Sequence, residues 1–242
     1  AMMMISIPFA WICLLPNDFI DFSKSILYSL GFNSNLYFWK ISLIYGNQDG
    51  LLKPFLHTWS LSVEEQYYIL FPIILLITFK YFRKYLIYIL TLGFIFSLGL
   101  ADFSSRNYPL FNFYLLPTRG WELLSGSILA YFEIRLGHRS KTKILNFTLP
   151  TLGLFLIVHS ILFFNDEMFH PSLYTLSPII GVCLIIWFSH KDELTTKILS
   201  TKLFVGIGLI SYSLYLWHYP ILAFDKISEF SQSDMVNKIL LW

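Results

Sequence analysis

Residues 60–79 read SLSVEEQYYILFPIILLITF, a short polar stretch followed by an almost uninterrupted apolar run. A helix crosses the hydrocarbon core of a bilayer with about 20 mostly apolar residues, so this stretch predicts a membrane-spanning helix. The whole chain of 242 residues has the same character, with 56% hydrophobic, 19% aromatic and 13% charged residues. Soluble domains carry about 25% charged residues. The sequence therefore predicts an all-α fold, a polytopic bundle of transmembrane helices.

Six stretches are long and apolar enough to be complete spans, and their short connections favour antiparallel neighbours. They are approximately Ser60–Phe79, Tyr85–Leu100, Leu110–Phe132, Phe147–Phe164, Ser172–Ser189 and Leu203–Phe224. Partial spans flank them, Ala1–Leu15 and a stub from Ile239, and we expect the chain to be truncated at both ends. The stretch Phe19–Trp39 is interrupted by serine, asparagine and lysine residues, and polar groups in lipid need partners within the protein. We interpret it as interfacial or re-entrant, with a full span as the alternative.

Basic residues gather in one set of connections. Three short loops of this set hold ten of them: Lys80, Arg83, Lys84, Arg135, Arg139, Lys141, Lys143, Lys191, Lys197 and Lys202. The opposite connections hold six, spread over a greater length. Because short cytoplasmic loops are enriched in Lys and Arg, the first set is predicted to be cytoplasmic. The segment His57–Gln66 and Tyr219 then lie near the outer surface.

The densest polar cluster is His57–Gln66, which leads into the first complete span. Ser60 is suited to cap the helix, and acids in the first turns meet the positive end of its dipole. Capping explains Ser60 and one acid, but not two adjacent acids and a glutamine entering a span, because the cost of polar groups rises with depth. Ser60 and Glu64 are four residues apart and share a helix face. With the nearby imidazole of His57, Glu64 would form a proton-handling pair, so these two are the candidate catalytic residues.

A second cluster contains Arg119 and Glu122, three residues apart within a span. They can form an ion pair along the helix. An arginine inside a membrane also faces the bundle interior or a watery cavity, where it can hold a carboxylate, a phosphate or an oxyanion. Both interpretations remain open.

A third cluster contains Ser211, Tyr215 and His218, which lie on one face of the last complete span at spacings of four and three. An aromatic belt at the membrane interface explains Trp217 and Tyr219 without any function, and a lone histidine at a helix end is commonly structural. The polar stripe behind His218 favours a cavity wall as the alternative.

Several kinds of site are not indicated. A net charge of +2 is too small to suggest a nucleic acid partner. Cys13 and Cys183 lie in apolar runs and are interpreted as buried small side chains. No spacing of cysteine and histidine fits zinc, and no glycine-rich phosphate loop is present, so neither a metal nor a bound cofactor is expected.

Three stretches together resemble the signatures of the acyltransferase 3 family of integral membrane O-acyltransferases. They are Lys53–Tyr68 (KPFLHTWSLSVEEQYY), Asn112–Leu123 (NFYLLPTRGWEL) and Gly208–His218 (GLISYSLYLWH). They occur in the family's order, and the resemblance runs from about Phe9 to Ile227. The family's Ser-Leu-x-x-Glu element falls on Ser60, Leu61 and Glu64.

The resemblance implies transfer of an acyl group, usually acetyl, from acyl-CoA to a hydroxyl of a surface polysaccharide or glycolipid, such as lipopolysaccharide O-antigen or peptidoglycan. Acyl-CoA would be a donor substrate, and the protein a multi-pass protein of the bacterial inner (plasma) membrane. The family's first helix carries an Arg and a His ten residues apart, followed by Arg-x-x-Arg, and neither pattern occurs here. Residues 1–242 would therefore be a partial membrane domain, without the N-terminal catalytic helices and the C-terminal part, and we expect it to be inactive by itself.

In such a mechanism Glu64 and His57 would handle protons or position the acceptor, and Arg119 would stabilise negative charge. The remaining candidates would line the substrate cavity: Trp59, Ser60, Glu122, Ser211, Tyr215 and His218. The rival hypothesis is a transporter or flippase for a small molecule or lipid. Transporters often place charge on broken helices in paired repeats, and no repeat is visible. A purely structural scaffold would leave Arg119 and the acidic cluster unexplained.

Overall fold

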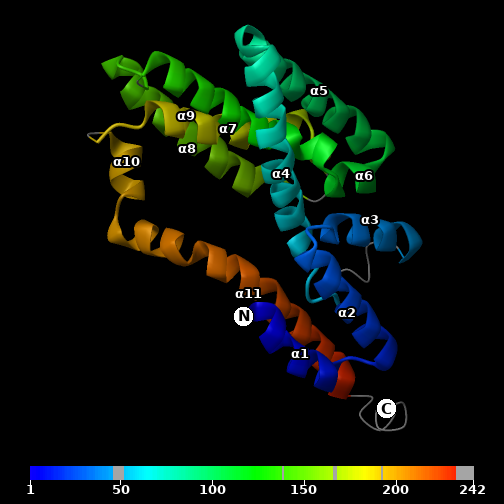
Figure 1. The fold of residues 1–242 in the computed structure, drawn as a ribbon. Coiled ribbons are helices and arrows are strands. Elements are labelled where there is room, and N and C mark those ends of the chain that lie inside the picture. The colour runs from blue at the N-terminus through cyan, green and yellow to red at the C-terminus, as the bar shows by residue number, and fades with distance from the viewer. Residues whose placement is uncertain (46–51, 138, 166–167, 192, 233–242) are drawn as a thin grey trace. The chain divides into compact units, whose positions relative to one another are not determined.

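The computed structural model describes residues 1–45, 52–137, 139–165, 168–191 and 193–232 (Figure 1). Over these residues the chain is helical, with no strand. The α-helices are α1 Met2–Cys13, α2 Pro16–Leu30, α3 Ser34–Tyr45, α4 Thr58–Tyr81, α5 Leu86–Asn107, α6 Pro109–Tyr114, α7 Leu116–Leu136, α8 Lys143–Phe163, α9 Leu176–Phe188, α10 Leu194–Leu199 and α11 Lys202–Gln232. Two 3₁₀ turns join them, η2 Arg83–Tyr85 and η3 Leu173–Thr175. The predicted all-α fold is confirmed.

Within the described residues, four helical segments are long and apolar enough to cross a membrane: Thr58–Tyr81, Arg83–Asn107, Lys143–Phe163 and Lys202–Ser228. They correspond to four of the six predicted spans. The predicted span Ser172–Ser189 corresponds to Leu173–Phe188, a shorter apolar helix. The predicted partial span Ala1–Leu15 corresponds to α1, which is also short and apolar. The stub from Ile239 lies outside the described residues.

The predicted span Leu110–Phe132 is wrong as a single helix, because the chain breaks between α6 and α7. Leu115 has extended backbone angles, φ −104° and ψ 144°. Pro117 causes the break, since a proline has no N–H to donate to the carbonyl four residues earlier and restricts the residues before it. That carbonyl, on Phe113, instead accepts a hydrogen bond from Nε of Arg119 at 2.9 Å.

The alternative of one full span over Phe19–Trp39 is also wrong. The segment contains two helices, α2 of 15 residues and α3 of 12. Between them Phe32 adopts a left-handed conformation with φ 54°, and neither helix reaches the length of about 20 residues that a span requires.

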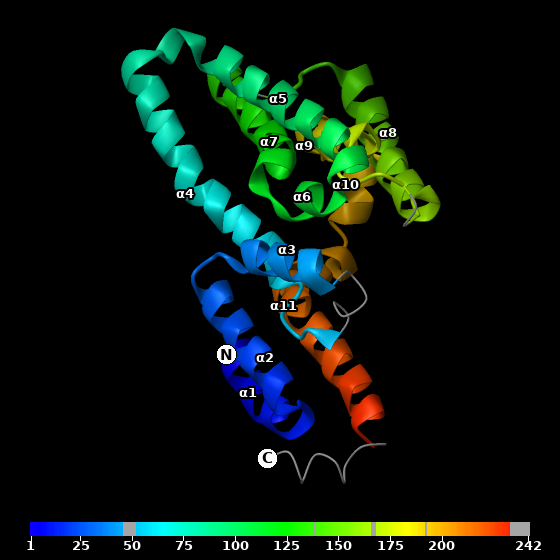
Figure 2. The ribbon, with the colours of Figure 1, turned by 90° about the vertical axis from the view of Figure 1, so that its right-hand side faces the viewer.

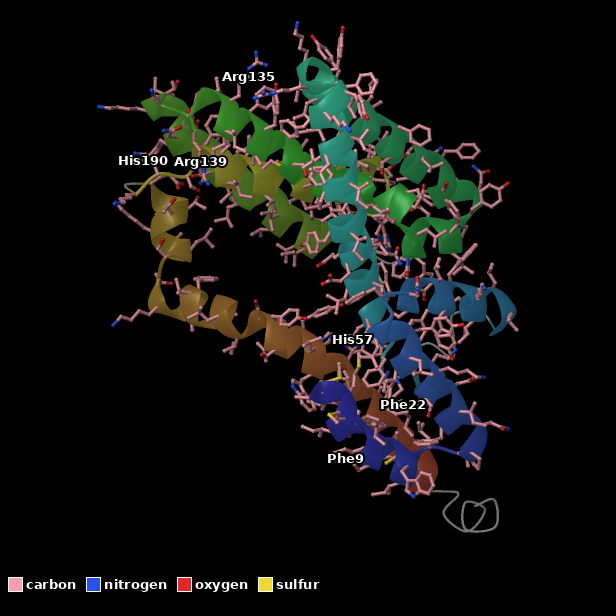
Figure 3. The ribbon with its side chains drawn as sticks, in the orientation of Figure 1. Phe9, Phe22, His57, Arg135, Arg139 and His190 are labelled. Atoms are coloured by element: carbon pink, nitrogen blue, oxygen red, sulfur yellow. The ribbon has the colours of Figure 1, made fainter. Side chains whose placement is uncertain are left out.

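The chain divides into two compact units, and α4 and α11 contribute to both. Unit 1 comprises Ala1–Gln66 with Gly208–Trp242, and unit 2 comprises Tyr67–Ile207. Aromatic rings join the helices of unit 1. The ring of Phe224 on α11 lies 6.2 Å from both Phe9 on α1 and Phe22 on α2, and Phe22 stacks on Phe55 at 5.1 Å. This packing holds α1, α2 and the turn before α4 against α11 (Figure 3).

Unit 2 is built from two antiparallel helix pairs, α5 with α7 and α8 with α9, which lie side by side in Figures 1 and 2. Trp121 of α7 is completely buried, and it packs with Leu98 and Ala101 of α5. The second pair crosses at two glycines. A Cβ on Gly153 would lie 2.5 Å from the carbonyl oxygen of Gly181, and a Cβ on Gly181 would lie 2.6 Å from that of Gly153. Only glycine permits such close contact of the two backbones.

The basic loops of unit 2 lie at one end of these pairs. Because α7 runs antiparallel to α5, Arg135 at its end is on the same side as η2 at the start of α5. Nη1 of Arg139 donates to the carbonyl of Ile186 near the end of α9 at 3.1 Å. Arg135, Arg139 and His190 accordingly gather at one end of the unit (Figure 3). This is the end that the loop charges predict to be cytoplasmic.

Candidate active site

The polar cluster His57–Gln66 forms the start of α4, but Ser60 does not cap the helix. The helix begins at Thr58, so the prediction of a Ser60 cap is wrong. A tight turn precedes it and supplies carbonyl partners: the N–H of Thr58 donates to Phe55 and that of Trp59 to Leu56. Because these early N–H groups already have acceptors, the Ser60 hydroxyl is available for another partner.

One face of the α4 start is bound to α2 and α3. Thr58, Ser62 and Gln66 are spaced by four and lie on this face. The hydroxyl of Thr58 is 2.8 Å from that of Ser29, and Ser62 Oγ is 2.7 Å from Ser34 Oγ. Gln66 completes the row, because its Nε2 donates to the Oδ1 of the Asn35 amide at 2.9 Å. These three residues were not among the sequence candidates, although their spacing of four could have indicated a shared polar face.

The other face of α4 contacts α11 through Ser60. The Tyr215 hydroxyl is 2.5 Å from the carbonyl oxygen of His57 and 2.6 Å from Ser60 Oγ. A carbonyl can only accept, so the phenol gives its one proton to the His57 carbonyl, and the Ser60 hydroxyl can donate to the phenol oxygen or, at 3.3 Å, to the same carbonyl. Glu64 lies one turn further along and within electrostatic range of Tyr215. Ser60, Glu64 and Tyr215, which the sequence places in two separate clusters, thus come together in unit 1.

His57 is buried at the centre of this group, with only 6% of its surface exposed. Its ring centroid lies 5.4 Å from that of Tyr215 and 5.7 Å from that of His218, and the ring of Tyr219 stacks on it at 5.5 Å. Figure 3 shows His57 where α4 begins beside α11. In the described part of the chain, neither ring nitrogen has a hydrogen-bond partner.

The surroundings of His57 favour its neutral form. Burial, followed by repulsion from a charge on His218, lowers its pKa to about 4. The backbone carbonyls of Leu216 and Pro54, close to the ring, oppose this shift but do not cancel it. A neutral imidazole with a free lone pair is the form that acts as a general base.

The other candidates of unit 1 are placed differently. The imidazole Nδ1 of His218 is 2.7 Å from the carbonyl oxygen of Tyr215, and the ring is exposed. The Ser211 hydroxyl donates to Gly208 of its own helix at 2.8 Å and is also exposed. Trp59 is half-buried beside His57 in sequence. Tyr215 and His218 therefore lie beside His57, whereas Ser211 bonds within its own helix.

Arg119 and Glu122 belong to unit 2 and lie just after the break before α7. Their side chains pair at 3.6 Å, and the guanidinium carbon of Arg119 lies 5.1 Å from the ring centroid of Phe113. Together with the hydrogen bond from Arg119 Nε to the Phe113 carbonyl, these contacts stabilise the break between α6 and α7.

Three residues that sequence reasoning missed support the same break. Ser97 Oγ donates to the Pro117 carbonyl at 2.6 Å and accepts from the N–H of Trp121 at 3.0 Å. It lies between two groups that bond directly in a regular helix. Thr118 Oγ1 donates to the carbonyl of Asn112, whose buried amide donates to the carbonyl of Pro171. Pro117 was the available sequence signal, since a proline predicts unpaired carbonyls around it.

Within the described residues, no three His, Cys, Asp or Glu side chains come together as a metal site. The α4 site presents an imidazole, two hydroxyls and a carboxylate, on His57, Ser60, Tyr215 and Glu64. These groups can take up a proton and orient a hydroxyl substrate.

Comparisons with known proteins give this site a context. The family model described as "Acyltransferase domain" matches residues 3–224. A Staphylococcus aureus protein named "Putative O-acetyltransferase" is 34% identical over 236 residues, which are 89% of this chain and 37% of that protein. The "Peptidoglycan O-acetyltransferase OatA" of Listeria monocytogenes is 33% identical over 227 residues, 86% of this chain and 35% of that protein. An uncharacterized protein of Haemophilus influenzae is 34% identical over 187 residues, 74% of this chain and 76% of that protein.

No solved structure matches the chain. The chain spans 37% of the length of the Staphylococcus relative and 35% of that of the Listeria relative. The family match covers all three polar clusters described above and three of the long apolar helices of a multi-pass membrane protein, and it ends within the fourth, α11. The chain belongs to the acyltransferase family that this model describes.

Proposed function

We propose that the chain is the membrane part of an O-acetyltransferase that transfers an acetyl group to a hydroxyl of a bacterial cell-surface glycan. The observation that carries this proposal is the buried imidazole of His57, whose ring nitrogens have no hydrogen-bond partner within the described residues. Acyl transfer to a sugar requires a base for the hydroxyl. The names of the relatives support acetyl as the group, and OatA supports peptidoglycan as the first acceptor to test.

In the proposed reaction His57 takes the proton of the acceptor hydroxyl. The hydroxyl oxygen then forms a bond to the acyl carbon, and the bond from that carbon to the donor breaks. Ser60 and Tyr215 orient the acceptor, with Glu64 beside them and Trp59 at the edge of the site. Acyl-CoA is the proposed source of the acyl group, the bacterial inner membrane is the proposed location, and lipopolysaccharide is the alternative acceptor.

For Arg119 and Glu122 we propose two tasks. They stabilise the break before α7, and the arginine charge attracts a carboxylate or phosphate of a substrate. Arg119→Lys separates the tasks, because lysine keeps the charge but cannot reproduce the planar fork of donors. Retained activity together with lowered stability of Arg119→Lys supports both tasks. Unchanged activity together with unchanged stability contradicts them.

The function is tested in a strain that lacks the gene and receives the complete gene on a plasmid. Ester-linked acetyl is released by mild alkali from isolated peptidoglycan and, separately, from lipopolysaccharide. We expect the wild-type gene to restore acetyl on one of these glycans, and isotope supplied as acetyl-CoA to permeabilised cells to appear there. Absence of acetyl on every surface glycan contradicts the proposal.

The role of Glu64 is tested in the same cells by Glu64→Gln. The matched control is Glu65→Gln, the adjacent acid of the same helix. We expect a large loss of glycan acetyl for Glu64→Gln and little change for Glu65→Gln. Full acetylation with Glu64→Gln would remove Glu64 from the mechanism.

A further inference from the structure

A buried base must release its proton after each reaction. His57 is 6% exposed, and the rings of Tyr215, His218 and Tyr219 surround it. A proton that it takes from a hydroxyl therefore has to pass through a neighbouring group to reach water.

His218 has the geometry of such a neighbour. Its ring centroid is 5.7 Å from that of His57, a separation that one water molecule can bridge, and its own ring is exposed. Its Nδ1 lies 2.7 Å from the Tyr215 carbonyl oxygen. Because a carbonyl can only accept, Nδ1 carries the hydrogen of the neutral ring. Nε2 therefore keeps its lone pair and can accept a proton.

The other groups around His57 are less suited to this task. The hydroxyl of Tyr215 is engaged by the His57 carbonyl and by Ser60. Tyr219 presents a phenol ring, and a phenol is a much weaker base than an imidazole. Glu64 lies about two helical turns further along the chain than His57 and interacts electrostatically with Tyr215.

We propose that His218 is a proton relay, which receives the proton from His57 during each acyl transfer and passes it to the external water. The inference rests on the proposed function. The acceptor oxygen bonds to the acyl carbon, the leaving group of a thioester donor takes the electron pair of the broken bond, and the hydroxyl proton moves to His57. It then moves to Nε2 of His218 while His57 returns to its neutral form. His218 acts through His57 and does not touch the substrate.

The direction of transfer agrees with the charge balance at the site. The pKa of His57 is lowered to about 4 by burial and by His218. Protonated His57 is therefore a strong acid for an imidazole, and the proton does not remain on it near neutral pH.

The test is His218→Gln, made in the complete gene and assayed in membranes at low buffer concentration. We expect the acetyl transfer rate to fall about 100-fold and to recover, in proportion to concentration, when imidazole is added as a small mobile proton carrier. His57→Gln should not recover, because its glutamine fills the buried position. His190→Gln, in an exposed loop, should behave as wild type. A His218→Gln protein with the full rate at low buffer, or one whose lost rate imidazole does not restore, contradicts the relay.

A second measurement does not depend on activity. Nitrogen-15 NMR of labelled histidines in detergent micelles should show His218 with its hydrogen on Nδ1. It should also show the pKa of His57 rising from about 4 in His218→Gln, because the repulsion from His218 is gone. If wild-type protein transfers no acetyl group, the proposed function fails, and the NMR titration still decides whether the rings are coupled. Independent titration of the two rings overturns the relay.

Discussion

The residues at the start of α4 divide their hydrogen bonds between two sides of unit 1. Thr58, Ser62 and Gln66 bond to α2 and α3, whereas Ser60 bonds to Tyr215 of α11. One side holds the helix in place, and the other faces the buried imidazole. These hydrogen bonds give four polar residues at the start of an apolar helix partners within the protein.

Ser62→Ala tests the supporting side. Ser62 is buried and accepts from the N–H of Ser34 at 3.2 Å. Removing the hydroxyl leaves a buried donor without its partner, so we expect a loss of about 1–3 kcal/mol in the free energy of unfolding. Thermal unfolding in detergent measures it. Ser211→Ala is the control, because its exposed hydroxyl bonds only locally to Gly208 and its loss should leave the transition unchanged. Equal stability of both variants contradicts this role for Ser62.

At this scale the sequence revealed the polar segment, and it revealed His57, Glu64 and Tyr215 as candidates. It could not reveal that Ser60 lies inside the helix, because that depends on the turn at Phe55 and Leu56. It could not reveal the burial of His57 either, since its neighbours come from a helix about 160 residues further along the chain.

At the scale of elements, glycine determines how closely α8 and α9 cross. Gly153→Ala places a Cβ 2.5 Å from the carbonyl oxygen of Gly181. Since backbone must move to admit it, we expect a loss of about 1–3 kcal/mol or more, measured as a lower unfolding temperature in detergent.

Gly126→Ala on α7 is the matched control for Gly153→Ala. A Cβ there meets no atom of the described residues within 4 Å, and alanine favours a helix over glycine by up to about 1 kcal/mol. Its unfolding temperature should stay equal or rise. A Gly153→Ala protein as stable as Gly126→Ala would show that the helices do not cross this closely.

Long apolar helices were predictable from length and composition, and the breaks were not. The break at Leu115 depends on Pro117 together with Ser97, which lies on another helix and partners the Pro117 carbonyl. The break at Phe32 depends on a left-handed backbone conformation. Because the residue is not a glycine, the sequence gives no sign of it. Local pattern predicts a helix well, but tertiary hydrogen bonds decide where it can be interrupted.

At the scale of the molecule, the loop charges assign the basic end of unit 2 to the cytoplasm. Cysteine labelling tests this after Cys13 and Cys183 are replaced by alanine. A membrane-impermeant maleimide should label Asn107→Cys in intact cells, since this exposed residue is the last of α5, at the opposite end. Thr142→Cys, among the basic residues, should react only after the membrane is opened. The reverse pattern would contradict this orientation of unit 2.

The proposed acyl transfer depends on His57 as its base. The decisive measurement is the rate of acetyl transfer to isolated glycan by the wild-type protein and by His57→Gln, in membranes between pH 4 and 8. Because its pKa is lowered to about 4, His57 is neutral through most of this range and becomes protonated only at the acid end. The wild-type rate should therefore stay level from about pH 8 to 5 and fall as pH approaches 4. His57→Gln should be slower on the order of 100-fold at every pH above 5. A His57→Gln protein that transfers acetyl at the wild-type rate would contradict the account.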